Sequence, residues 1–262
     1  MEKITKSPLL TDNSDFIFLY DGTLCNPNGD PDQENKPRMD YDTDTNLVTD
    51  TRVKRYIRDF LKANGTEIFV DMEADTKVSP DSKLKAVVNR VLSEENALNE
   101  IFGDNQHFRE TFEKIIKEKK EADSIFKALQ EKKTIELNTF ILEYLVKERF
   151  VDIRMFGSAF AVGGFTKAYT GAIQLNWGYS LHKVELVDSA TIVTTMNDDS
   201  STFGKDYRVY YSLLAFNGSI NKLAAQHNGL TVVDRDTFRN AIWKWFIMKA
   251  SLTVIWVIYE NT

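Results

Sequence analysis

Cationic side chains gather in one short stretch of this chain, where their types and spacing suit the binding of a polyanion. Residues 52–62 hold five of them: Arg52, Lys54, Arg55, Arg58 and Lys62. The preceding segment adds Arg38 and the side-chain amides of Asn26 and Asn28. Guanidinium, ammonium and amide groups bond to phosphates and 2′-hydroxyls without reading a base sequence. Because the formal net charge of the whole chain is −6, this local excess of cations favours a nucleic-acid site over an ordinary solvated face.

These cations lie on a predicted helix that Thr49 or Asp50 can cap and that ends at Asn64. Its apolar residues recur at helical spacing and form one stripe: Val53, Ile57, Phe60 and Leu61. Before the helix, Asp15–Tyr20 predicts a strand buried on both faces. The polar segment between them, residues 21–50, is rich in Asn, Asp, Gly and Pro, which set sharp turns. We therefore expect a long loop of fixed shape next to the helix.

Farther along the chain the periodicity changes twice. Glu67–Val70 predicts a second strand that packs with the first strand and the basic helix. Residues 74–150 are charge-rich and show helical spacing of apolar residues, for example at Phe108 and Phe112 in one helix. From Val151 the apolar residues alternate instead, which predicts a strand with Arg154 and Phe156 pointing outwards.

A projecting hairpin is predicted from two strands, Val184–Thr195 and Tyr207–Phe216. The segment that joins them is polar except for Met196 and Phe203, and Lys205 lies near its end. Apolar side chains at a hairpin tip have little to pack against in their own subunit, so they are suited to wedge between stacked bases. A plain surface loop is the alternative interpretation.

Composition limits the remaining classes of protein. The hydrophobic fraction of 42% and the charged fraction of 27% are those of a soluble globular protein. Cys25 is the single cysteine, which excludes an internal disulfide and a multi-cysteine zinc site and fits a reducing cytoplasm. Residues 1–8 mix charges without an apolar segment, so we expect no signal peptide. The three histidines lack metal-ligand spacing, and we expect no cofactor.

Two other functions remain open from the residues alone. The aspartates of the first loop, Asp21, Asp30, Asp32 and Asp40, could hold a metal ion for ribonuclease chemistry. The alternative is that they make turns, which Asp beside Gly or Pro commonly does. A free-standing single-strand RNA-binding module of the RRM type would place aromatic side chains on the face of its sheet. Phe156 is the comparable residue, since Phe16 and Phe18 are expected in the core.

Several motifs resemble one known family in the expected order. They are Phe16-Ile17-Phe18-Leu19-Tyr20-Asp21, Asn26-Pro27-Asn28-Gly29-Asp30-Pro31, Asn35-Lys36-Pro37-Arg38, Leu47-Val48-Thr49-Asp50-Thr51-Arg52-Val53-Lys54-Arg55, Asp152-Ile153-Arg154-Met155-Phe156-Gly157, Thr170-Gly171-Ala172-Ile173-Gln174, Gly178-Tyr179-Ser180-Leu181 and Ser201-Thr202-Phe203-Gly204-Lys205-Asp206-Tyr207. They resemble the backbone subunit of type I CRISPR surveillance complexes (Cascade), subtype I-B in particular, within the RAMP superfamily.

The resemblance implies an α+β fold, with an RRM-like palm of the ferredoxin type formed by residues 1–73 and 150–262. Residues 74–149 would be a helical fingers insertion, and the hairpin at about 184–216 the thumb. Family members polymerise along a CRISPR RNA, displace one base at regular intervals and present the others for pairing with target DNA. Expected partners are thus the guide RNA, target DNA through the guide, neighbouring copies and other Cascade subunits, with neither catalysis nor membrane contact.

Candidate RNA-binding residues follow from the cationic stretch, the hairpin and the matching motifs together. They are Asn26, Asn28, Arg38, Thr51, Arg52, Lys54, Arg55, Arg58, Arg154, Phe156, Met196, Phe203 and Lys205.

The chain departs from this family after Trp243. The family usually continues with a Gly, a basic Arg-Ser-Lys segment and a closing strand, whereas this chain continues with Lys244-Trp245-Phe246. Lys244 and Lys249 interrupt the apolar run, and what remains is too short to span a membrane. We therefore predict a helix followed by a terminal strand at 253–259.

Overall fold

The computed structural model describes residues 7–70, 95–103, 105–119, 121–162, 165–188, 191–194, 202–249 and 254–260. The chain divides into two compact units. One, the sheet unit, comprises Met1–Asn64, Ile173–Lys222 and Thr231–Thr262. The other, the helical unit, comprises Gly65–Ala172 and Leu223–Leu230. Within the described ranges, no helix is both long and apolar enough to cross a bilayer.

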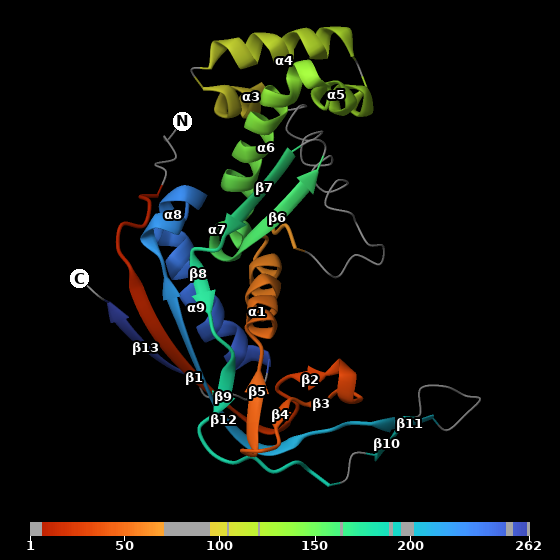
Figure 1. Ribbon diagram of the computed structural model, residues 1–262, viewed down its shortest axis with the longest axis vertical. Helices are drawn as coiled ribbons and strands as arrows, with labels where there is room; N and C mark the ends of the chain where they lie inside the picture. Colours follow the sequence, from red (N-terminus) through yellow and green to blue (C-terminus); the bar gives the residue numbers. More distant parts are fainter. Residues whose placement is uncertain are drawn as a thin grey trace. The chain divides into compact units, whose positions relative to one another are not determined.

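An antiparallel sheet forms the centre of the sheet unit (Figure 1). Its strands are β1 (Ser14–Cys25), β4 (Met39–Asp40), β5 (Thr45–Val48), β8 (Ile173–Leu175), β9 (Gly178–Ser180), β12 (Val209–Ile220) and β13 (Val254–Glu260). The order is β13-β1-β12-β9-β5-β4, and β8 also pairs with β12. Neighbouring strands run antiparallel throughout. Strands from both ends of the chain therefore lie side by side.

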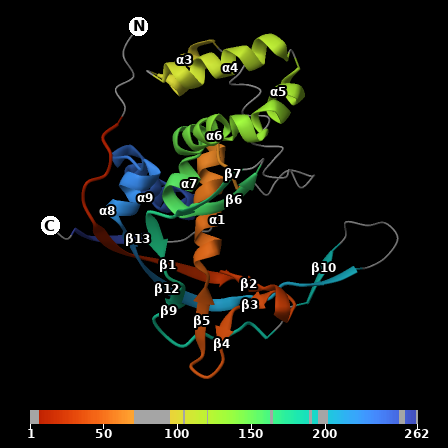
Figure 2. The same cartoon turned by 45° about the horizontal axis from the view of Figure 1, so that its top comes forward.

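Two packed helices, α1 (Asp50–Ala63) and α9 (Val232–Lys249), cover one face of this sheet (Figure 2). The predicted apolar stripe of α1 is buried, and Thr49 caps the helix by accepting a hydrogen bond from the backbone N–H of Arg52. On β1 the buried side chains alternate with exposed ones. Phe16 packs on Phe238 of α9, with ring centroids 5.5 Å apart. The prediction that β1 is buried on both faces is wrong: helices cover one face only.

The predicted loop over residues 21–50 is largely regular. After β1 it forms β2 (Gly29–Asp30), the 3-10 helix η1 (Pro31–Gln33) and β3 (Lys36–Pro37) before β4 and β5. β2 and β3 pair with each other, as do β4 and β5. The turns use left-handed backbone at Glu34, Asn35 and Asp44, with φ of 53°, 61° and 56°. Turn-forming residues therefore give this segment a defined local conformation.

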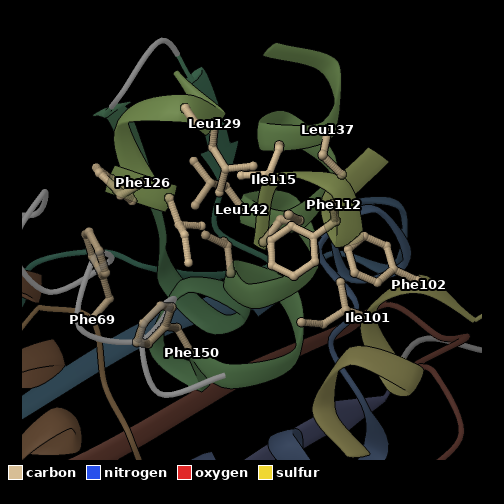
Figure 3. Packing of buried hydrophobic residues seen from close by; sticks show 14 of the residues in the cluster. Phe69, Ile101, Phe102, Phe112, Ile115, Phe126, Leu129, Leu137, Leu142 and Phe150 are labelled. Atoms are coloured by element: carbon tan, nitrogen blue, oxygen red, sulfur yellow. The ribbon is translucent and has the colours of Figure 1, made fainter. Parts of the chain in front are cut away.

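The helical unit contains most of the predicted insertion. Its elements are α3 (Glu95–Phe102), α4 (Gln106–Glu118), α5 (Ala122–Leu129), η2 (Lys132–Thr134), α6 (Ile135–Arg149), α7 (Val151–Phe156), β6 (Gly157–Val162), β7 (Phe165–Thr170) and α8 (Lys222–Asn228). Figure 3 shows their shared core, where Phe112, Leu137 and Phe150 are buried together. The helices predicted around Phe108 and Phe140 are confirmed as α4 and α6. The helix predicted to begin at Ser79 lies outside the described residues.

Two strand predictions in this unit are wrong, for different reasons. The side chain of Asp152 is fully buried and accepts the backbone N–H groups of Phe69 and Val70, at 2.9 and 3.1 Å. The N–H groups of Phe69 and Val70 therefore bind a carboxylate instead of a neighbouring strand. Glu67–Val70 is not a strand in the structure. Val151–Phe156, predicted as a strand, is the short helix α7, in which consecutive residues are buried. Six residues are too few for alternation to distinguish a strand from a buried helix.

A hairpin forms here, but not from the two predicted strands: Tyr207–Phe216 lies mostly in β12 of the central sheet, and Phe203, predicted at the tip, lies on a strand. β10 (Thr191–Thr194) pairs antiparallel with β11 (Thr202–Lys205), and Val193 lies opposite Phe203. Residues 184–188 are not a strand, although an isolated bridge joins Leu186 to Val209. Met196 and the rest of the tip, residues 195–201, lie outside the described residues. At the chain's end, the predicted helix and terminal strand are confirmed as α9 and β13.

Candidate nucleic-acid interface

The loop and the basic helix are joined by the side chain of Asn28. Its Oδ1 accepts hydrogen bonds from the backbone N–H and the hydroxyl of Thr49, at 2.9 and 3.0 Å. Thr49 in turn caps α1 by accepting the Arg52 N–H at 3.2 Å. Asn26 donates from Nδ2 to the carbonyl of Asn35 at 2.7 Å. Both amides that the sequence marked as RNA ligands therefore hold the loop itself in place.

We expect Asn28→Ala to act on the loop first and on ligand binding second. The change removes two hydrogen bonds at the start of α1, so the free energy of unfolding should fall by about 2 kcal/mol. Asn28→Asp keeps the accepting oxygens and should recover most of that loss. Urea denaturation measures the stability of both variants. An alanine variant as stable as wild type would show that Asn28 does not position the helix.

The cations of α1 are partly neutralised on their own helix. Lys54 pairs with Asp50 at 2.9 Å, and Arg55 pairs with Asp59 at 2.7 Å, both four residues apart. Helix α1 carries five cations and two carboxylates, so its net charge is +3. A guanidinium carries five N–H donors, so one ion pair does not exhaust Arg55. Both pairs are half-buried, and the remaining N–H donors of Arg55 can still bind a second anion.

The remaining predicted residues of this helix take different positions. Arg52 donates from Nε to the Tyr56 hydroxyl at 2.9 Å and lies over that ring at 4.7 Å. Thr51 is exposed beside it, and Arg58 is partly exposed. The buried stripe of α1 faces the protein interior, so these polar side chains lie on its outer side. The arrangement provides a positive surface on the outer side of α1.

Arg38 connects the loop to the sheet. Its backbone carbonyl accepts the N–H of Leu47 at 2.8 Å and the Asn46 amide at 2.9 Å. Its guanidinium pairs with Asp30 at 3.4 Å and lies 6.0 Å from the ring of Trp177. The backbone thus fixes the position of a cation that stands next to an exposed aromatic ring.

At the base of the hairpin, Lys205 contacts the turn after η1. Its ammonium pairs with Glu34 at 2.8 Å, and the Tyr207 hydroxyl donates to the same carboxylate oxygen at 2.7 Å. The hydrogen bond that Lys205 donates to Glu34 lowers the pKa of the Glu34 carboxyl and raises the pKa of the Lys205 ammonium. Lys205, predicted as an RNA ligand, therefore anchors β11 to this turn.

Arg154 and Phe156 belong to the helical unit, apart from the α1 residues. Arg154 donates from Nη1 to the carbonyls of Lys147 and Glu148, at 2.8 and 3.1 Å. It thereby satisfies carbonyl groups in the last turn of α6, which have no partner within that helix. Phe156 is half-buried, and its backbone approaches Gly171 so closely that a Cβ there would lie 2.5 Å from the Phe156 carbonyl carbon. Arg154 and Phe156 were predicted to point outwards, but both make contacts within the helical unit.

Of the four candidate aspartates, Asp30 and Asp40 make turns, and Asp21 lies on β1. Asp30 accepts the N–H of Asp32, and Asp40 accepts the N–H of Asp42, both at 3.1 Å. Among the residues described here, no three His, Cys, Asp or Glu side chains are grouped as metal ligands. Burial and the nearby Asp21 raise the pKa of the Cys25 thiol, which favours its neutral form.

Sequence reasoning missed a group of aromatic residues on the sheet face opposite α1 and α9, which none of the described helices covers. Directly paired residues of antiparallel strands share a face. Tyr179 lies opposite Ala215, and Tyr211 lies opposite Thr23, on the face away from buried Phe18. Alternation was the available signal, since exposed Trp177, Tyr179 and Leu181 flank buried Gly178 and Ser180. We call Trp177, Tyr179, His182 and Tyr211 the aromatic face.

Comparison with known proteins gives one family. Residues 12–255 match the family model described as "CRISPR-associated protein Cas7". A curated relative of that name from Haloferax volcanii is 25% identical over 246 residues, which are 88% of this chain and 63% of the relative. The chain thus spans less than two thirds of that relative's length.

Two solved structures are also similar to this chain. One is titled "CRISPR RNA-guided surveillance complex, pre-nicking", with a TM-score of 0.47, 14% identity, and coverage of 90% of this chain and 72% of that chain. The other, "CRISPR RNA-guided surveillance complex", has a TM-score of 0.43, 13% identity, and coverage of 91% and 75%.

Proposed function

This chain belongs to the family of CRISPR-associated protein Cas7, and we propose that it binds a CRISPR guide RNA as a backbone subunit of a surveillance complex. The observation that carries the proposal is the family match over residues 12–255, within which lies the cationic helix α1. Further support is the side chain of Asn28, which ties the polar loop to the start of that helix. The subunit would polymerise along the guide in the cytoplasm, without catalysing a reaction, and present bases to target DNA.

The architecture supports a palm of the ferredoxin type for this subunit. In chain order β1, α1, β8–β9, β12, α9 and β13 follow a βαββαβ pattern, with antiparallel order β13-β1-β12-β9. We propose residues 1–73 and 150–262 as palm and 74–149 as fingers, although the compact helical unit extends beyond the proposed fingers, over Gly65–Ala172. The β10–β11 hairpin would be the thumb.

In this proposal the chain holds the guide by its backbone. Arg52, Lys54, Arg55 and Arg58 would contact phosphates, while Arg38 extends the cationic surface at the sheet edge. These contacts leave the bases unread, so one subunit can bind any guide sequence. Met196 and Phe203 at the hairpin would separate one base from its neighbours, and other subunits of the complex would bind next to the filament.

Replacement of Arg55 and Arg58 by alanine tests the phosphate contacts. Each lost contact to a single strand should lower the salt slope of binding by roughly 0.7, so the double variant should lose about 1.4. Binding to guides of different sequence should weaken equally. Fluorescence anisotropy over a range of salt concentrations measures both quantities.

Arg109→Ala is the matched control for this experiment. Arg109 pairs with Glu113 four residues away on α4, as Arg55 pairs with Asp59 on α1. The control should keep the wild-type slope. A double variant with unchanged affinity and slope would contradict the proposed palm contacts, and a loss confined to some sequences would contradict backbone recognition.

Particle size separates the backbone subunit from a free-standing RNA-binding module. On a long guide RNA, the proposed subunit should form a filament or a defined multi-subunit particle. A complex of one protein with one RNA would favour the module instead. Light scattering of the chain mixed with guide RNA gives this result directly.

A further inference from the structure

We propose that the aromatic face is a second contact for single-stranded RNA, on which unpaired bases stack against Trp177 and Tyr179. The inference depends on the proposed function for the identity of its ligand, but it concerns another surface. The α1 cations lie on the outer side of the helices that cover one face of the sheet, whereas the aromatic face lies on the opposite side. A strand bound there would therefore touch the protein through its bases.

A β-bulge places Trp177 in this position. Gly218 pairs with Leu175 and Leu214 pairs with Ser180, so four steps along β12 oppose five steps along β8 and β9. The extra residue leaves both Asn176 and Trp177 exposed between buried Leu175 and Gly178. Bulges commonly redirect a side chain next to a functional site. Here the bulge adds a large ring to the row begun by Tyr179.

The rings are open to a ligand, and the orientation of Tyr211 is fixed by His182. Trp177 and Tyr179 are each 50% exposed, and Tyr211 is 41% exposed. The His182 ring stacks on Tyr211 with centroids 5.4 Å apart and an interplanar angle of 11°. His182 accepts the Leu213 N–H at Nε2, and its Nδ1 donates to the Lys183 carbonyl at 2.7 Å. A ring held in this way loses little conformational entropy when a ligand contacts it.

The charged groups near the aromatic face are two cations, Arg38 and Lys183, and three carboxylates. Arg38 stands beside the Trp177 ring. Three carboxylates near the rings are each paired within the chain: Asp30 with Arg38, Asp44 with Lys183, and Asp21 with the Tyr211 hydroxyl. Pairing reduces the repulsion that a phosphate backbone would meet at this face. Exposed aromatic rings next to a cation are the combination that binds single strands without sequence preference.

The test is the double variant Trp177→Ala with Tyr179→Ala in the full chain, probed with single-stranded oligouridine RNA. The loss of two stacking rings should lower affinity at least about 30-fold at fixed salt. The salt slope should stay at its wild-type value, because the change removes no phosphate contact. Trp243→Ala is the matched control, since Trp243 is 48% exposed on α9 and should leave both quantities unchanged.

Several results distinguish this inference from the proposed function. One outcome is that the Arg55 and Arg58 double variant shows a reduced salt dependence of RNA binding while the aromatic double variant binds like wild type. In that case bases do not stack on the aromatic face, and the proposed function stands. A wild-type chain that binds no RNA overturns both. If the aromatic double variant changes self-association in the absence of RNA, as measured by sedimentation, the face binds protein and the inference fails. An RNA carrying 2-aminopurine should show stacking quench with wild type and recover fluorescence with the double variant.

Discussion

A chain whose β10–β11 hairpin lacks residues 197–201 is expected to remain folded and to bind RNA weakly, yet to lose ordered assembly on a guide. The paired strands Thr191–Thr194 and Thr202–Lys205 belong to the sheet unit, and the deleted residues lie between them. If Met196 and Phe203 stack against bases, each base contact contributes about 1–3 kcal/mol. Because every subunit repeats that contact along a guide, the deletion should abolish the periodic displacement of bases.

Chemical probing of the bound guide measures this result as a repeating pattern of exposed nucleotides. Phe203→Ala should weaken the repeat in the same direction. Asp198→Ser combined with Asp199→Ser is the matched control, since it alters the polar tip without changing its length. If the shortened protein gave the wild-type repeat, the hairpin would be a surface loop, and the thumb would have to be sought elsewhere in the chain.

The elements that the sequence predicted well are those whose signal is local. The stripe Val53, Ile57, Phe60 and Leu61 repeats with helical spacing, and Thr49 supplies the cap within the same short segment. Nothing distant is needed to define α1, so its boundaries and buried side follow from the residues themselves. The terminal helix and strand, α9 and β13, were predictable for the same reason.

The elements that the sequence predicted poorly depend on partners far along the chain. The amide of Asn28 could have faced a ligand, and only the fold shows it bound to Thr49, 21 residues away. Trp177 is exposed through a bulge that is defined by its pairing with β12. Single-sequence reasoning identifies side chains able to bind RNA, but it cannot tell which of them the fold already uses.

Asp152→Ala should be the most destabilising of the single substitutions considered. The carboxylate of Asp152 is fully buried and accepts the N–H groups of Phe69 and Val70. Its removal leaves two backbone donors in the interior of the helical unit without a carboxylate, and hydrogen bonds to a charged group are worth about 1.5–3 kcal/mol each. The free energy of unfolding should therefore fall by about 3–5 kcal/mol, as measured by urea denaturation.

The same substitution decides what the segment Asp152–Gly157 does. Under the strand prediction, the segment would bind RNA through Arg154 and Phe156, and Asp152→Ala would affect binding more than stability. In the structure, the buried carboxylate of Asp152 instead holds the backbone of Phe69 and Val70 within the helical unit. Asp152→Asn keeps one accepting oxygen and should lose less stability than alanine, whereas the exposed Glu131→Ala should change it by less than about 0.5 kcal/mol. Full stability with lost RNA affinity in Asp152→Ala would restore the RNA-binding interpretation, because a structural carboxylate cannot be removed without cost.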